Sequence, residues 1–348
     1  LIPDTELALG EMNYEQHRFQ VALEHFQIVE KYPQSRVYAY GMYKSAWALY
    51  NLKRNETAIE KLIDVVKYFD PNKPKITKVN HNLRSEAIQD LALIFEDVHT
   101  ADKAYDFFSK ICTEEELSKA MINLGKLYQS HSRHKDLNIF LAEFTKKNPL
   151  SNERIRAHLM MVESFETLKE RDKVVSQLEE LALLCKADST YRKANDKIAV
   201  EHCDYDLAKA NVEIAKKWWD LWLKQKQNKQ LANYTLKAFE LHLNREDKTK
   251  PDVKSRYAYA ELNYQLEDYR QASAQYELVS DKAVDTTMLH DSTYSAIVAL
   301  EKASEKKLEK TDKDEQLLLL TKYLDRYPAA AYTYQVKFKI ALVSGLEY

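Results

Sequence analysis

The chain has 348 residues with 52 basic and 54 acidic side chains, which gives a formal net charge of −2. Only 4 glycines and 7 prolines occur, so sandwiches, barrels and doubly wound sheets are disfavoured, because their turns need glycine. The balanced charge lacks the basic excess of nucleic-acid-binding proteins, and no apolar run reaches the roughly 20 residues of a membrane-spanning helix. An all-α fold is therefore expected.

A pattern of helix, short polar turn and helix begins near the N-terminus and recurs along the chain. The second helix of each pair carries a small or aliphatic residue, a large residue four positions on, and another apolar residue three positions further. The sets are Ala22, Phe26 and Val29; Ala58, Leu62 and Val65; Ala104, Phe108 and Ile111; Leu137, Leu141 and Phe144; Val174, Leu178 and Leu181; and Ala272, Tyr276 and Val279. Such a period predicts stacked helix pairs.

The helix expected at residues 38–52 carries two apolar stripes at helical spacing. The packing stripe, at the positions that the repeat pattern buries, consists of Met42, Ser45, Ala46 and Leu49. The aromatic stripe consists of Tyr40, Tyr43, Trp47 and Tyr50, followed by Asn51. The sequence leaves open whether the aromatic stripe is a binding surface or is covered by packing, since tyrosine serves both roles.

Two later segments depart from the repeat. Residues 70–82 (DPNKPKITKVNHN) read as a solvated loop inserted between the second and third repeats. Residues 191–227 keep helical spacing, and we expect either one very long helix or two helices with a break near residues 202–204. For Trp218, Trp219 and Trp222 packing is the expectation, because adjacent tryptophans must point to different sides of one helix.

Residues 122–149 (INLGKLYQSHSRHKDLNIFLAEFTKKNP) carry Leu124, Gly125, Tyr128 and Pro149 at a characteristic spacing. With this motif the chain resembles the tetratricopeptide repeat (TPR) family over most of its length, although Met121 stands at the family's tryptophan position. The resemblance implies a TPR-like α-solenoid, a right-handed superhelix of antiparallel helix pairs, with one long central helix. It divides the chain into residues 1–188 and 189–348, the second part beginning with the long helix and ending in a capping helix.

The segment at residues 83–108 (LRSEAIQDLALIFEDVHTADKAYDFF) and the order of elements around the tryptophan-rich stretch also resemble large TPR proteins of bacterial cell-envelope machines, including gliding-motility complexes. This resemblance implies a periplasmic or cell-envelope location, with the cytoplasm as the alternative. The chain begins at Leu1 and shows no signal peptide, and we expect a fragment or a processed chain.

No catalytic motif is found. Four glycines cannot build a phosphate-binding loop, and G-x-S-x-G, H-E-x-x-H and C-x-x-C are absent. His131 and His134 beside Asp136 could ligate zinc. However, they lie in an expected turn, and with Asp136 they supply fewer than the four ligands of a structural zinc site. Cys112, Cys185 and Cys203 are expected as buried free thiols, with one disulfide as the alternative in an exported protein. We therefore expect no enzyme activity, no metal and no cofactor.

The resemblance implies that the first helix of each pair lines a concave binding face. The candidate partner-binding residues are Tyr40, Tyr43, Trp47, Tyr50 and Asn51; Glu86, Gln89 and Leu93, with Glu96 and Asp97; Lys119, Ile122, Lys126 and Gln129; and Tyr257, Glu261 and Tyr264. Aromatic residues beside carboxylates suit a peptide with apolar anchors and basic residues. Leu7 and Glu11 stand where co-chaperone TPR domains carry carboxylate-gripping residues, which disfavours that role.

These observations predict a non-enzymatic scaffold that binds a protein or peptide partner, within a bacterial envelope assembly. An intracellular regulator that binds a signalling peptide is the alternative, and an enzyme would need a catalytic part outside these residues. No nucleic acid and no small-molecule substrate is expected, and membrane association is expected only through missing segments or partners.

Overall fold

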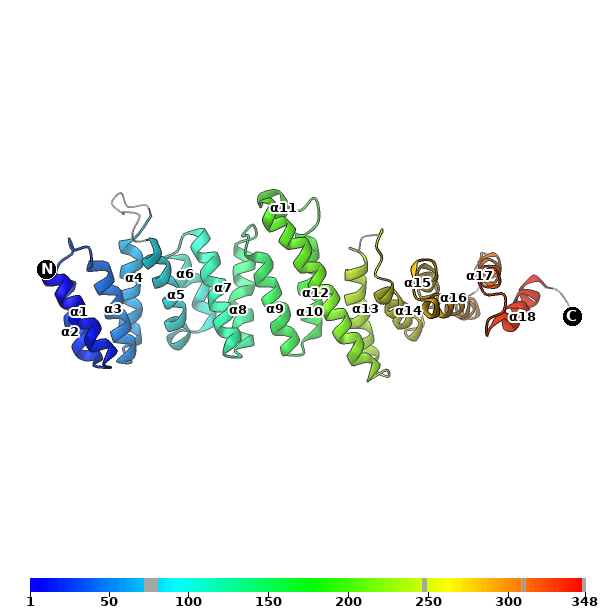
Figure 1. The fold of residues 1–348 in the computed structure, drawn as a ribbon, viewed down its shortest axis with the longest axis horizontal. Helices are drawn as coiled ribbons and strands as arrows, with labels where there is room; N and C mark the ends of the chain where they lie inside the picture. Colours follow the sequence, from blue (N-terminus) through cyan, green and yellow to red (C-terminus); the bar gives the residue numbers. More distant parts are fainter. Residues whose placement is uncertain (72–80, 246–248, 308, 310, 346–348) are drawn as a thin grey trace. The chain divides into compact units, whose positions relative to one another are not determined.

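A computed structural model describes residues 1–71, 81–245, 249–307, 309 and 311–345. These residues form α-helices joined by short turns, and no strand occurs among them, which confirms the all-α prediction. Figure 1 shows the helices of the first unit, from α1 to α9, following one another in chain order. The chain forms two compact units, one of residues 1–177 and 187–199 and the other of residues 178–186 and 200–348. Residue 188 itself belongs to the first unit, and the boundary predicted after it stays a prediction.

The first unit is built from consecutive helix pairs. Its elements are α1 (Ile2–Glu15), α2 (Phe19–Val29), α3 (Tyr38–Asn51), α4 (Asn55–Tyr68), α5 (His81–Val98), η2 (Ala101–Lys103), α6 (Ala104–Ser109), α7 (Glu114–Ser130), α8 (His134–Lys147), α9 (Arg154–Thr167) and α11 (Thr190–Ala194), and α10 (Arg171–Leu184) begins in it. Neighbouring helices contact each other from α1 to α5 and from α7 to α9. The loop predicted at residues 70–82 lies largely outside the described residues, and α5 begins at His81.

The second unit repeats the same plan around a longer helix. Its elements are α12 (Lys197–Leu223), α13 (Lys229–Leu243), α14 (Val253–Gln265), α15 (Tyr269–Lys282), α16 (Thr286–Lys306), α17 (Asp312–Arg326) and α18 (Thr333–Ser344). The single long helix predicted at the centre is confirmed as α12, and the break considered near residues 202–204 is wrong. The chain leaves helical geometry earlier, at Asn195, whose backbone is extended.

The second helix of each pair buries its apolar residues as the repeat predicts. In α2, Ala22, Phe26 and Val29 are fully buried, and the corresponding residues of α4, α8, α10 and α15 are at most 2% exposed. Ile111 is the exception, because α6 ends at Ser109 and Ile111 lies in the following turn, half-buried. This regular burial confirms a TPR-like α-solenoid of helix pairs.

A tight turn recurs between the two helices of a pair. His17, Lys53, Ser132, Lys169 and Glu267 each have a positive φ, between 58° and 66°. In each turn the next residue's amide donates to a carbonyl five positions back, as Arg133 does to Tyr128 over 2.8 Å. This pattern is a Schellman-type helix end, which satisfies the last carbonyls of the first helix and reverses the chain.

The buried Arg84 fixes α5 against its neighbours. Its guanidinium donates to both carboxylate oxygens of Glu116, over 2.6 and 2.7 Å, and to the backbone carbonyls of Val66 and Ile111. The Arg84 side chain is 7% exposed, so these partners replace the water that its charge has lost. One side chain thus links α5 to α4 and to the start of α7.

Two features of the second unit answer predictions made from the sequence. Trp218 and Trp222 are at most 2% exposed, and Trp219 stacks on Trp222 with ring centroids 5.2 Å apart, which confirms packing.

Cys185 and Cys203 form a disulfide, with Cα atoms 5.7 Å apart. The expectation of free thiols is therefore wrong for these two residues, because the end of α10 brings Cys185 against α12; Cys112 alone remains a free thiol.

Candidate protein-binding face

The two stripes of α3 differ in burial as the repeat pattern predicts. Every member of the packing stripe is at most 5% exposed. The residues of the aromatic stripe, and Asn51 after them, are half-buried instead. The rings therefore keep part of their surface accessible on the side where the first helices α1, α3, α5 and α7 lie next to one another, which we call the first-helix face.

Hydrogen bonds connect α3 to the preceding first helix. The Tyr40 hydroxyl donates to Glu11 over 3.2 Å, and the Asn51 amide donates to the Tyr14 hydroxyl over 2.8 Å. The Lys44 ammonium lies 3.4 Å from the same Glu11 carboxylate and 5.1 Å from the centre of the Tyr40 ring. This edge of the aromatic stripe is held by polar contacts with α1.

A second set of hydrogen bonds connects α3 to the following first helix, α5. Tyr43 and Trp47 both donate to one oxygen of Asp90, over 2.7 and 3.0 Å. Tyr50 donates to Asp97 over 2.9 Å. The aromatic stripe therefore bridges two repeats, and each ring has its orientation fixed by a partner on a neighbouring helix. Sequence reasoning missed Asp90, which lies one position after Gln89 and outside the five groove positions that the family pattern assigns.

The rings also contact each other along α3. Tyr40 and Tyr43 are stacked with centroids 6.1 Å apart, and Trp47 meets Tyr50 edge to face at 5.8 Å. Ring pairs of this kind add stability beyond the area that they bury. The four rings of the aromatic stripe therefore form two contacting pairs along α3.

Burial controls the electrostatics of this surface. Desolvation raises the pKa of Asp90, although the hydrogen bonds from Tyr43 and Trp47 act in the opposite direction. Desolvation and the bond to Asp90 also raise the pKa of Tyr43, and burial raises that of Tyr50 beside Asp97. Both hydroxyls therefore remain protonated donors at neutral pH, while carboxylates give the surface its charge.

The predicted residues of α5 take different places. Glu86, Gln89 and Asp97 are exposed and Leu93 is half-buried. Glu96, which the pattern assigned to the binding face, is 8% exposed, so that assignment is wrong. Its carboxylate lies 3.3 Å from Arg133 and 2.9 Å from His131, and these ion pairs turn it toward the loop between α7 and α8.

The candidate zinc ligands do not converge. His131 pairs with Glu96, while Asp136 accepts a hydrogen bond from Arg133 over 2.9 Å. Over the described ranges, no group of three histidine, cysteine or carboxylate side chains is arranged to hold a metal ion.

The first-helix face continues onto α7 with a different character. A small pocket of about 100 Å³ lies between α5 and α7, and Gln89, Lys119 and Asn123 are among its lining residues. Lys126 is exposed, and Gln129 donates to Glu163 over 2.7 Å. Ile122, however, is 2% exposed, so its assignment to the face is wrong and it belongs to the core.

The predicted residues of α14 belong to the second unit. Tyr257 meets Tyr276 edge to face at 5.7 Å, and Tyr264 meets Tyr269 in the same way at 5.2 Å. The Tyr276 hydroxyl donates to Glu261, and burial raises the pKa of Tyr257 to about 12. All three predicted residues are half-buried, and these contacts join α14 to α15.

Comparisons with known proteins give little beyond this geometry. No protein-family model and no curated protein matches the chain. Among solved structures, the chain is similar to the TPR2AB domain of yeast Sti1 in its pHSP90 complex, at 14% identity and a TM-score of 0.29, covering 98% of each chain.

The TPR domain of P58(IPK) gives 14% identity and a TM-score of 0.26, covering 99% of this chain and 89% of that one. The human IFIT1 dimer with m7Gppp-AAAA gives 12% identity and a TM-score of 0.22, covering 98% of this chain and 86% of that one. At these TM-scores the similarities carry no argument about partners.

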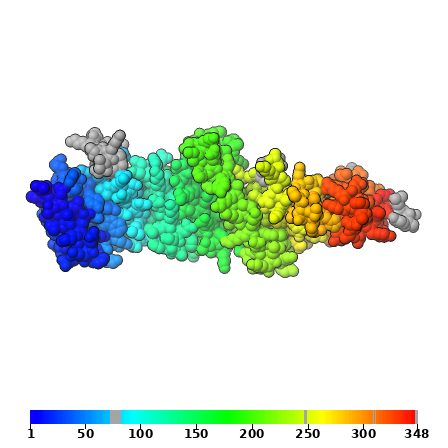
Figure 2. Space-filling view, in the orientation of Figure 1, coloured from blue at the N-terminus to red at the C-terminus, as the bar shows by residue number. Residues whose placement is uncertain are grey.

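On the side drawn in Figure 2, the side chains of α1 to α9 pack into a continuous surface within the first unit. Within the described ranges, no helix combines the length and the apolar character needed to cross a membrane.

Proposed function

We propose that this protein is a non-enzymatic protein–protein interaction scaffold whose first-helix face binds a protein partner through the aromatic stripe of α3. The observation that carries the proposal is the division of α3 into a fully buried stripe and a half-buried aromatic one. The repeat pattern requires only the first stripe to be buried. The second has rings fixed in place by Glu11, Asp90 and Asp97, and pre-oriented aromatic side chains are the commonest anchors of binding energy.

The chemistry of the face favours a partner segment with apolar anchors and basic side chains. Glu86, Asp90 and Asp97 lie on α5 beside the rings, and the rings already accept cations from the chain itself. Lys44 lies 5.1 Å from the centre of the Tyr40 ring, and Lys53 lies 5.9 Å from that of Tyr50. A lysine or arginine of the partner would gain both cation–π contact and carboxylate pairing, whereas nucleic-acid phosphates would be repelled.

We further propose that the scaffold works in an oxidising compartment, in a bacterial periplasmic or envelope assembly. The Cys185–Cys203 disulfide supports this location, because disulfides persist outside the reducing cytosol. The resemblance to envelope TPR proteins supports it as well. The alternative is an intracellular regulator that binds a signalling peptide, and it requires both cysteines to be reduced in the cell.

Site-specific photo-crosslinking in cells tests the binding face. A benzoylphenylalanine replaces Gln89, which is exposed on α5, or Gln27, which is exposed on the second helix α2 as a matched control. A defined protein should crosslink to position 89 but not to position 27, and Trp47→Ala should reduce that crosslink. Equal crosslinking from both positions, or a position 89 product that is insensitive to Trp47→Ala, would contradict the proposal. Crosslinks to RNA from position 89 would contradict the choice of a protein partner.

A further inference from the structure

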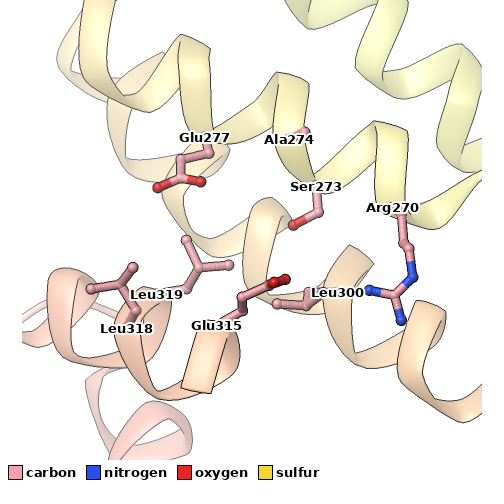
Figure 3. A pocket seen from close by; sticks show the side chains of 8 residues that line it. All are labelled: Arg270, Ser273, Ala274, Glu277, Leu300, Glu315, Leu318 and Leu319. Atoms are coloured by element: carbon pink, nitrogen blue, oxygen red, sulfur yellow. The ribbon is translucent and has the colours of Figure 1, made fainter. Parts of the chain in front are cut away.

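A pocket in the second unit is lined by residues of α15, α16 and α17 that the proposed binding face does not use. It has a volume of about 340 Å³ and opens between α15 and α17, with α16 below it. Leu300 of α16 and Leu319 of α17 are buried at its base, whereas Leu318 is 64% exposed at its edge. Figure 3 shows Ala274 and Glu277 on one side and Glu315 on the other. The volume lies at the lower end of the range typical of ligand sites.

Ion pairs hold one end of this pocket together. Arg270 of α15 lies 2.8 Å from Asp312 and 3.3 Å from Glu309. The Asp312 side chain is 1% exposed, so the pair is shielded from solvent on the carboxylate side. The start of α17 is thereby fixed against α15.

The other end is held by a second set of ion pairs. Lys322 of α17 lies 2.9 Å from Glu277, and Arg326 lies 2.7 Å from Asp281. Ion pairs bridge α15 and α17 at both ends of their contact. The space between these ends therefore stays open above Leu300, Leu318 and Leu319 and is not closed by their side chains. The pocket is therefore a built feature of the fold.

The charges around the pocket are unbalanced. Arg270, Lys322 and Arg326 all pair with carboxylates of the neighbouring helix. The carboxylates that line or bridge the pocket number five, against these three cations: Glu277, Asp281, Glu309, Asp312 and Glu315. Glu315 is exposed on the pocket wall and forms no ion pair within the described residues, although its charge acts on the nearby Arg270. The opening thus combines an apolar base with a net negative rim.

We propose that this pocket is a second docking site, which takes an apolar side chain of a partner polypeptide with a basic residue beside it. The apolar side chain covers Leu300, Leu318 and Leu319, and the basic group pairs with Glu315 at the rim. The site does not depend on the first-helix face, and it gives the scaffold a second contact, which lies in the second unit.

Fluorescence anisotropy with defined peptides tests the chemistry. The probe is a labelled KKLLKK peptide, compared with KKSSKK, which lacks the apolar side chains, and EELLEE, which reverses the charge. KKLLKK should bind the whole chain at least tenfold more tightly than either comparison peptide. Equal binding of KKLLKK and KKSSKK would mean that the peptides bind through their charge alone, which would overturn the proposal.

Matched variants test the location. Ala274→Trp fills the pocket from an exposed position, and Ala208→Trp places the same side chain on an exposed position of α12. Glu315→Lys reverses the rim charge, and Asp314→Lys makes the same change one residue away. The pocket variants should weaken KKLLKK binding at least tenfold, while their controls should leave it within twofold. Circular dichroism melts of all four variants check that each is folded.

Two results would assign the binding elsewhere. If Trp47→Ala removes KKLLKK binding and Ala274→Trp does not, the peptide occupies the first-helix face and the pocket is empty. If sedimentation shows that the wild type self-associates and Ala274→Trp does not, the occupant is a second copy of this chain. Either result overturns the proposal.

Discussion

Trp47 donates its indole hydrogen to Asp90 over 3.0 Å, and this bond joins two successive first helices. The same carboxylate oxygen accepts the hydroxyl of Tyr43. A half-buried ring on the proposed binding face therefore also contributes to the interface between repeats. A hydrogen bond of this kind adds about 1 kcal/mol of net stability, which is small beside the loss from disrupting a buried packing position.

The raised pKa of Asp90 predicts how stability changes with pH. Because burial raises this pKa above its ordinary value of 3.8, the folded state binds the proton more tightly than the unfolded state does. The Asp90 contribution to stability is therefore greatest below pH 3.8 and falls as pH rises through the raised pKa. The amide oxygen of Asp90→Asn still accepts from Trp47, but the variant does not titrate at this position. The stability of Asp90→Asn relative to the wild type should therefore increase as pH rises from 3.8 through the raised pKa. Urea unfolding at a series of pH values measures the difference; a difference that shrinks with rising pH contradicts the assignment.

Two glycines in first helices should respond differently to alanine. A Cβ at Gly41 would lie 2.6 Å from Cγ1 of Val29, a stiff β-branched side chain, whereas a Cβ at Gly125 would meet the terminal methyl of Met160. Overpacking costs about 1–3 kcal/mol, and alanine regains about 1 kcal/mol of helix propensity. Gly41→Ala should therefore destabilise by up to about 2 kcal/mol, and Gly125→Ala should be nearly neutral. Chemical denaturation compares them, and equal losses would show that Met160 cannot move.

The left-handed turn at Ser132 offers a stabilising substitution. Its φ of 58° places a non-glycine residue in a region that costs L-residues about 1–2 kcal/mol. Ser132→Gly should raise the free energy of unfolding by about 0.5–1 kcal/mol, while Ser132→Ala should not. If glycine and alanine behave alike in thermal melts, the turn has another conformation in solution.

The three cysteines should differ in their accessibility to a thiol reagent. Burial raises the pKa of Cys112 to about 12, so native protein at pH 8 should react only slowly with a thiol reagent. Unfolding without reductant should expose one thiol, and unfolding with reductant should expose three. Because the disulfide closes a loop across a separation of 18 residues, Cys203→Ala should cost about 3 kcal/mol. Two or three thiols in the unreduced, unfolded protein would show that the bond is not formed.

Helical periodicity was sufficient to predict the pairing of helices and most of their buried residues. Ala58 and Leu62 are buried because the small–large spacing places them on one face of α4. The packing positions of α3 follow from the same periodicity. Periodicity is a property of one helix, so these predictions needed no knowledge of the neighbouring helices.

The remaining features depend on contacts between distant residues. The repeat pattern assigns Glu96 to the groove, yet its carboxylate pairs with Arg133 and His131 instead. The spacing of residues along one helix cannot predict this contact. Asp90 was missed because its role depends on Tyr43 and Trp47, 47 and 43 residues earlier in the chain. The disulfide depends on where α10 ends beside α12, which cysteine spacing does not specify.

The most direct test of the binding face compares three substitutions in one set of measurements. Trp47→Ala removes a half-buried ring of the aromatic stripe, Met42→Asp places a charge in the packing stripe, and Tyr205→Ala removes an exposed ring of α12 as the control. The readouts are the melting temperature and the Kd for the protein that crosslinks from position 89.

Trp47→Ala should weaken binding at least tenfold, as expected for a tryptophan anchor worth about 2 kcal/mol, with only a small change in melting temperature. Met42→Asp should unfold the protein at a much lower temperature, and Tyr205→Ala should change neither quantity. If Trp47→Ala lowers the melting temperature as much as Met42→Asp does and leaves the Kd unchanged, the aromatic stripe is packing and the proposed binding face is contradicted.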